Sequence, residues 1–126
     1  MFKIRNEQAR ALTTLVRDNF EERAVRHLRD HEPAETAACS DAELRRRVRQ
    51  GTPRAGKYGL TTEQQVMAFV DVTYLVGPEF DTDDGQPWAR GVLTDPALEP
   101  DDKASLLLWL GRSVAQERRA REAQHG

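Results

Sequence analysis

The sequence contains a single cysteine, Cys39, so no disulfide bond can form within the chain. A secreted domain of this size more often carries paired cysteines. The sequence also lacks any apolar run close to the roughly 20 residues that span a bilayer, and its N-terminal MFKIRNEQ has no signal-peptide stretch. From these absences we expect a cytoplasmic protein that does not enter a membrane.

The motifs of common catalytic sites are absent as well. There is no nucleophile elbow, no glycine-rich phosphate loop and no cysteine beside an obvious base. Ser40 and Ser113 have structural roles, as a helix cap and a helix residue. Carboxylates are plentiful between residues 79 and 102, but an open acidic loop offers neither the burial nor the neighbour that tunes a general acid. We therefore expect neither enzyme activity nor a cofactor.

The stretch EFDTDDGQPW, residues 79–88, raises the question of a calcium site. An EF-hand loop has carboxylates at its first, third and fifth positions, glycine at the sixth and a bidentate Glu at the twelfth. When Asp81 and Asp83 take the first and third positions, Gly85 falls at the fifth and Val92 at the twelfth. The signature fails at two positions, so we do not expect calcium binding.

Residue types that bind zinc cluster in one place, at His27, His31 and Cys39. The two histidines stand four residues apart and can share one face of a helix. The pattern HExxH is absent, because Glu32 follows both histidines. Two ordinary surface histidines and a small buried thiol account for the same residues, and we expect no metal site.

The charge of the chain is low overall but unevenly distributed. The 126 residues suit one domain, and 19 Lys and Arg against 21 Asp and Glu give a net charge of -2. That balance argues against a general nucleic-acid binder. Residues 1–60 carry 13 basic and 9 acidic residues, whereas residues 61–126 carry 6 and 12. Such halves can attract each other within one fold or steer a charged partner.

The first expected helix begins with Asn6 as N-cap and ends near Pro33. Apolar residues recur along it at three- and four-residue spacing, which places them on one helical face, with Leu15 and Val25 widening the stripe. We expect this helix to supply a large share of the core. The stripe consists of Ala9, Leu12, Val16, Phe20, Ala24 and Leu28.

A capping box predicts the start of the second helix, because Ser40 and Glu43 stand at the required spacing in SDAE. Gly59 is the natural left-handed C-cap of this segment. Before that cap, three residues are expected to weaken or kink the helix. They are Gly51, Pro53 and Gly56.

Three further helices are expected in the second half of the chain. Thr61 with Gln64 predicts the start of a central helix with apolar side chains on more than one face, and Gly77 and Pro78 end it. A short helix then starts at Pro87, with Trp88 and Leu93 pinning it to the core. The last helix starts at Pro100 and frays over residues 119–126. The whole is an all-α domain of residues 1–126, with four main helices and one short one.

Two charged surfaces are the candidate contact sites. The acidic loop is either a solvated turn or a docking surface for a basic partner, with Trp88 beside it contributing affinity. The arginine run ELRRRVRQGTPRAGK offers a second patch, which is either a solvated or internally paired face or a phosphate-binding one. The residues concerned are Glu79, Asp81, Asp83 and Asp84 in the loop, and Arg45, Arg46 and Arg49 in the run.

Residues 58–98, YGLTTEQQVMAFVDVTYLVGPEFDTDDGQPWARGVLTDPAL, together with the N-terminal IRNEQ, resemble a bacterial protein family. Its members are small, largely uncharacterised, and often encoded beside type VI secretion spike, Rhs or effector genes. The similarity covers most of the chain and rests on helix caps, a Gly-Pro stop and aromatic anchors. Pro53 and Gly56 depart from the family's pattern, because members of the family are expected to continue their second helix through these positions. No catalytic motif is carried over.

The resemblance implies a protein that works by contact with other proteins. We expect an adaptor or chaperone-like accessory protein that helps a secretion effector or spike component to load. An immunity protein that binds and neutralises a toxin is one alternative. A nucleic-acid-binding regulator that uses the arginine run is another.

Overall fold

The computed structural model describes the backbone of residues 6–82 and 86–125 and the side chains of residues 15–82 and 86–124. Within these residues all regular secondary structure is helical, which confirms the all-α prediction. The short helix α2 lies between the first and second expected helices. The helices are α1 (Asn6–His31), α2 (Pro33–Thr36), α3 (Asp41–Gly56), α4 (Glu63–Leu75), α5 (Pro87–Thr94) and α6 (Pro100–His125).

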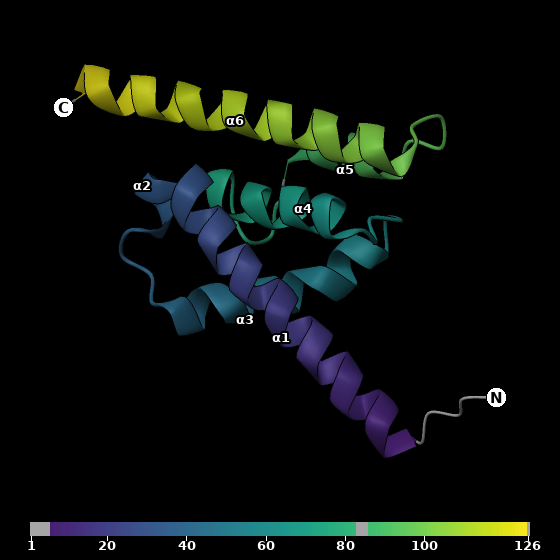
Figure 1. Cartoon of the computed structure of the whole chain (residues 1–126). Coiled ribbons are helices and arrows are strands. Elements are labelled where there is room, and N and C mark those ends of the chain that lie inside the picture. Colours follow the sequence, from purple (N-terminus) through teal and green to yellow (C-terminus); the bar gives the residue numbers. More distant parts are fainter. Residues whose placement is uncertain (1–5, 83–85, 126) are drawn as a thin grey trace.

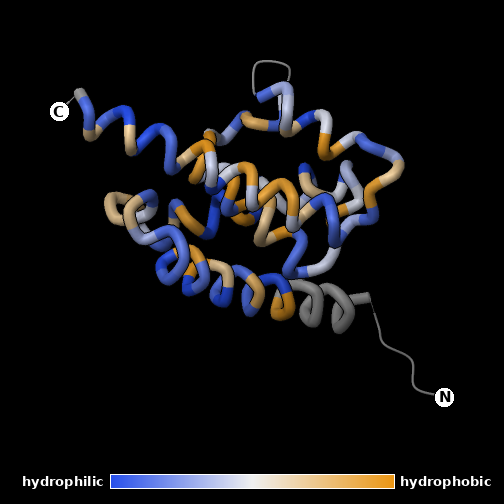
Figure 2. The backbone as a smooth tube through the Cα atoms, turned by 90° about the horizontal axis from the view of Figure 1, so that it is seen from above, coloured by the Kyte–Doolittle hydropathy of each residue, from blue (hydrophilic) through white to orange (hydrophobic). Residues whose placement is uncertain are grey.

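Helix α4 forms the centre of the molecule. It packs chiefly against α6 on one side and α3 on the other, and Figure 1 shows it enclosed between α6 and the α1 and α3 pair. Ten of its 13 residues are buried, and the most hydrophobic part of the chain gathers in this central region in Figure 2. The prediction of a central helix with apolar residues on several faces is confirmed.

The cap of α4 lies one residue later than predicted. Thr62, not Thr61, is the N-cap, and its hydroxyl accepts a hydrogen bond from the Gln65 backbone at 3.2 Å. Because TTEQQ satisfies the capping pattern in two registers, packing decides between them. The observed register buries Gln65 and leaves Gln64 exposed.

The N-cap of α3 is where the sequence placed it, and Gly59 has the expected left-handed backbone, two residues after the C-cap Lys57. Ser40 and Glu43 form a complete capping box. Gly59 has a φ of +82°, and the next residue, Leu60, donates its backbone N–H to the carbonyl of Ala55 at 3.1 Å. That bond and the one from Gly59 to Gly56 make a Schellman motif.

Helix α3 continues to Gly56 although three residues were expected to weaken or kink it. Pro53 lies inside the helix, and the hydroxyl of its neighbour Thr52 donates to the carbonyl of Val48 at 2.8 Å. Gly51 is buried where α3 meets α4, and a Cβ atom added to it would lie 3.0 Å from Val70 Cγ2. This glycine therefore allows close helix packing.

Helix α1 supplies less of the core than predicted. Its C-terminal half buries Ala24, Val25 and Leu28, but Leu15 is 56% exposed and Val16 is 62% exposed. The side chains of Ala9 and Leu12 lie outside the described residues. At 26 residues α1 is longer than α3 and α4, which have 16 and 13. Its N-terminal half therefore extends beyond the body of the molecule (Figure 1).

Candidate protein-binding groove

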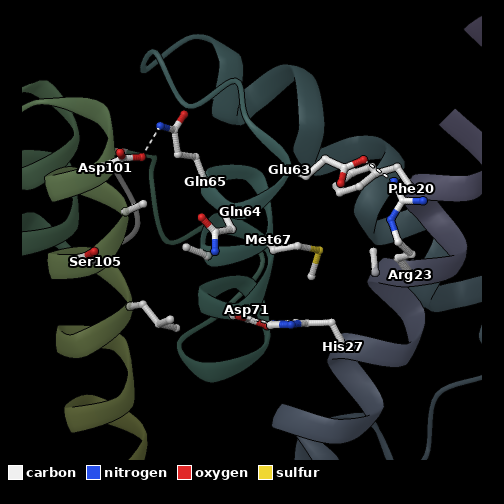
Figure 3. Close-up of a pocket in the computed structure, with 14 residues that line it drawn as sticks. Phe20, Arg23, His27, Glu63, Gln64, Gln65, Met67, Asp71, Asp101 and Ser105 are labelled. Carbon is white, nitrogen blue, oxygen red and sulfur yellow. Dashed lines mark hydrogen bonds and ion pairs between the residues drawn. The ribbon is translucent and has the colours of Figure 1, made fainter. Parts of the chain in front are cut away.

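Helices α1 and α6 stand on opposite sides of α4 and leave an open groove of about 540 Å³ between them. Figure 3 looks into it, with α4 as the floor between the two walls. The floor and walls carry both apolar and polar side chains. The main apolar residues are Phe20, Ala24, Met67, Ala68 and Leu108, and the polar ones are Arg23, His27, Glu63, Gln64, Gln65, Asp71, Asp101 and Ser105.

Acidic groups outnumber fully cationic ones around the groove. Glu63 forms an ion pair with Arg23 at one edge. Asp101, at the start of α6, accepts a hydrogen bond of 2.7 Å from the neutral amide of Gln65. The position of Asp101 in the first turn suits the positive end of the helix dipole. This end of the groove therefore presents negative charge next to an apolar floor.

The deepest polar contact of the groove joins α1 to α4. A hydrogen bond of 2.8 Å connects His27 Nε2 and Asp71 Oδ2, which Figure 3 shows facing each other at the floor. Asp71 is almost wholly buried. The hydrogen bond to Asp71 raises the pKa of His27, although partial burial acts in the opposite direction. On its other side the ring of His27 stacks on His31, with centroids 4.3 Å apart.

A second buried carboxylate lies next to this pair. Glu32, between α1 and α2, accepts hydrogen bonds of 2.9 and 3.3 Å from the guanidinium of Arg112 on α6. Burial, followed by the negative charge of the neighbouring Asp71, raises the pKa of Glu32 to about 7. Within the described residues Asp71 Oδ1 has no hydrogen-bond partner. Asp71 and Glu32 therefore belong to one electrostatic unit.

The residues of the expected acidic surface differ in exposure and in their contacts. Glu79 is exposed. Asp81 is only 5% exposed, because its carboxylate accepts hydrogen bonds from Arg54 and from the Tyr58 hydroxyl. Its charge is thus engaged inside the chain. Asp83 and Asp84 lie outside the described residues, as does Gly85.

The aromatic residues that flank this loop hold it to the body. Phe80 is buried and packs against Phe69, with ring centroids 4.9 Å apart. Trp88, in the first turn of α5, is half-buried against the core. Trp88 is therefore mainly a packing residue that retains some accessible surface.

The arginine run is also partly engaged within the fold. Arg49 makes a bidentate contact with buried Glu21, with both distances 2.8 Å. Arg47 lies over the ring of Tyr74, 4.3 Å from its centroid. Arg45 and Arg46 are exposed on the surface of α3. The available basic surface is therefore smaller than the sequence suggests.

Trp109 was not among the expected contact residues, yet it is the most exposed large apolar side chain in the described part, at 65%. It follows Ser105 by four residues, so it extends the α6 wall of the groove by one helical turn. The signal was present in the sequence, because the stripe of Ala104, Leu107 and Ala115 leaves Trp109 on another face. The pair of His27 and Asp71, by contrast, is 44 residues apart and has no local signal.

Two further observations apply to the described residues. None of the helices there is long and apolar enough to cross a membrane. No group of three or more His, Cys, Asp or Glu side chains in that part of the chain is arranged to hold a metal ion. Comparison of the sequence and structure with protein-family models, with curated proteins and with solved structures gives no match.

Proposed function

We propose that this protein is a non-enzymatic interaction module that binds another protein in the groove between α1 and α6. The observation that carries the proposal is the groove itself, about 540 Å³ of open space over an apolar floor. An amphipathic helix laid between two helices is a common mode of peptide recognition. Exposed Trp109 beside the groove adds the residue type that most often dominates binding energy.

The chemistry of the groove favours a helical segment with one apolar face and basic residues near it. Phe20, Met67 and Leu108 supply the apolar contacts. Asp101, whose partner is the neutral amide of Gln65, places negative charge at one end, where Lys or Arg of the partner gains favourable long-range attraction. The C-terminal half of the chain, with 12 acidic and 6 basic residues, reinforces this preference.

The resemblance of residues 58–98 supports a role in type VI secretion. The proposed role is that of an adaptor or chaperone-like accessory protein for an effector or spike component. An immunity protein would use the same groove to hold a toxin. A nucleic-acid role has less support, because Arg47, Arg49 and Arg54 already contact groups within the fold.

The test is affinity capture from the native cell with the wild-type chain and two matched variants. Gln64→Arg places a bulky cation in the groove, whereas Gln50→Arg makes the same change on the exposed surface of α3. We expect wild type and Gln50→Arg to recover a secretion effector or spike protein, and Gln64→Arg to lose at least about tenfold of it, or about 1.4 kcal/mol.

Gene deletion separates the adaptor from its main alternative. Loss of effector delivery without loss of viability supports an accessory role. Self-intoxication of the deletion strain, relieved by removing the toxin, would instead identify an immunity protein. Recovery of the same proteins by Gln64→Arg and wild type would remove the groove as the binding site.

A further inference from the structure

Two hydrogen-bonded pairs of ionisable side chains lie next to each other inside the fold. His27 and Asp71 line the groove, whereas Glu32 and Arg112 line a second hollow of about 130 Å³. Contacts of 2.8 Å (His27 to Asp71) and 2.9 Å (Arg112 to Glu32) form the two ends. Between them lie Asp71 and Glu32, whose side chains are both 1% exposed and which are close enough for the charge of Asp71 to raise the pKa of Glu32.

Two ionised carboxylates cannot hydrogen-bond to each other, because neither has a proton to donate. This accounts for Asp71 Oδ1, which is buried and has no partner among the described residues. A buried oxygen without a donor is costly. A proton on Glu32 removes the cost, because the carboxyl group can then donate to Asp71 while still accepting from Arg112.

We propose that His27, Asp71, Glu32 and Arg112 hold one shared proton, carried by Glu32 or by His27, and that this proton sets how firmly α1, α4 and α6 are held around the groove. With the proton present the four groups sum to zero charge in either arrangement. Without it they carry one uncompensated negative charge in the interior, which is strongly unfavourable.

The directions of the pKa shifts agree with this geometry. Burial and the neighbouring Asp71 raise the pKa of Glu32 to about 7, and the hydrogen bond to Asp71 raises the pKa of His27. Both groups thus bind protons more tightly in the folded than in the unfolded chain. The resulting stabilisation is present at mildly acidic pH and is lost as pH rises through about 7.

The other charged groups around the cluster leave it dependent on the proton. His31 stacks on His27 from the same helix. Glu35 of α2 and Arg119 of α6, which also line the second hollow, form an ion pair with each other. Among the described residues, Arg112 is the only permanent cation that contacts Glu32 or Asp71.

The test uses the free protein and compares Glu32→Gln with Glu35→Gln in urea unfolding at about pH 5 and about pH 8. For release of one proton, the unfolding equilibrium constant of wild type rises up to about tenfold per pH unit. The amide of Glu32→Gln donates to Asp71 at every pH. Between the two pH values we therefore expect the logarithm of its unfolding equilibrium constant to change by less than about half as much as in wild type. Glu35→Gln removes the same charge from the adjacent ion pair and keeps the full dependence.

A spectroscopic readout separates a shared proton from a general loss of stability. Imidazole ¹⁵N shifts of His27 report its titration, and its midpoint moves to lower pH in Glu32→Gln because one anionic neighbour is gone. If Glu32→Gln does not fold, Asp71→Asn serves in its place, since its amide can also donate between the two groups. Full wild-type dependence in the folded variant, or an equal loss in Glu35→Gln, would overturn the proposal.

A consequence for the partner rests on the proposed function. Because His27 and Asp71 line the groove, a bound helix covers them and changes the affinity for the proton. Capture of the partner then varies with pH in wild type and less so in Glu32→Gln. The unfolding test needs no partner, so failure of the proton cluster and failure of the groove as a binding site give different results.

Discussion

At the level of single residues, the arginines and carboxylates of this chain are largely used to hold distant segments together. Arg49 contacts buried Glu21, 28 residues away, and Arg112 contacts Glu32, 80 residues away. Removing one partner of such a pair leaves a charge in a poorly solvated place, which costs more than the pair itself contributes. These contacts therefore fix which helix faces meet.

The buried carboxylate of Asp81 is expected to stabilise the fold through its hydrogen bonds from Arg54 and Tyr58. We expect Asp81→Asn to lower the free energy of unfolding by about 2 kcal/mol, because Arg54 loses its charged acceptor and Tyr58 a strong one. Urea unfolding at neutral pH measures the change. The matched control is Glu79→Gln, on the exposed side of the same turn, with an effect within about 0.5 kcal/mol. Unchanged stability of Asp81→Asn, with loss of partner capture, would return Asp81 to the contact surface.

The sequence could not reveal the role of Asp81. Its spacing excluded an EF-hand and indicated a charged turn, and both conclusions use neighbouring residues only. The partner of its carboxylate, Arg54, is 27 residues away on a helix whose rotation depends on packing. The same limit applies to His27 and Asp71, since side-chain contacts between helices follow from the tertiary arrangement.

At the level of elements, two glycines allow other helices to pack closely against α4. Gly51 of α3 and Gly111 of α6 lie against its opposite sides, where added Cβ atoms would lie 3.0 Å from Val70 and 3.1 Å from Val72. Two helices can therefore approach the central helix closely. Gly56, at the end of α3, has nothing within 4 Å of such a position.

Alanine at Gly51 and alanine at Gly56 are expected to change stability in opposite directions. Gly51→Ala should lower the free energy of unfolding by about 1–3 kcal/mol, because Val70 has to move in a packed core. Gly56→Ala should raise it by about 0.5 kcal/mol, because alanine restricts the unfolded chain and has room in the helix. Urea unfolding of both variants, with circular dichroism as the probe, measures the two effects. A gain in stability for Gly51→Ala would show that α3 does not approach α4 so closely.

Local signals predicted the elements well and their packing less well. The capping box at Ser40 and the left-handed Gly59 depend on residues within one turn, and both are confirmed. The start of α4 was wrong by one residue because two local registers were equivalent. The expected burial of Val16 was wrong for another reason. Its helical stripe is present in the sequence, but the other helices leave Val16 62% exposed.

At the scale of the whole molecule, unequal helix lengths create the groove. Helices α1 and α6 have 26 residues each, and α4 between them has 13. The longer helices form walls that the central helix does not fill. Neither the groove nor the exposed Trp109 beside it requires any special motif, so the sequence pattern predicted only the charged loop and the arginine run as contact surfaces.

The last prediction concerns the acid limb of the pH dependence of stability. The hydrogen bond from Arg49 and its charge lower the pKa of Glu21, although burial opposes this. A group whose folded pKa is lowered stabilises the fold above its unfolded value of about 4.5, and this stabilisation is lost as pH falls through the folded pKa. Glu32 and His27 act in the opposite direction near neutral pH.

Together these groups place the maximum of stability near pH 4.5, because the stabilisation by Glu21 is present above that unfolded value and the stabilisation by Glu32 begins to be lost there. Melting temperatures across the pH range should show two limbs with separate origins. Glu21→Gln should reduce the slope of the acid limb and leave the limb near pH 7 unchanged, because the two carboxyl groups belong to different ion pairs. A variant that altered both limbs equally would mean that the pairs of Glu21 and Glu32 are coupled through α1, which carries Glu21 and leads directly into Glu32.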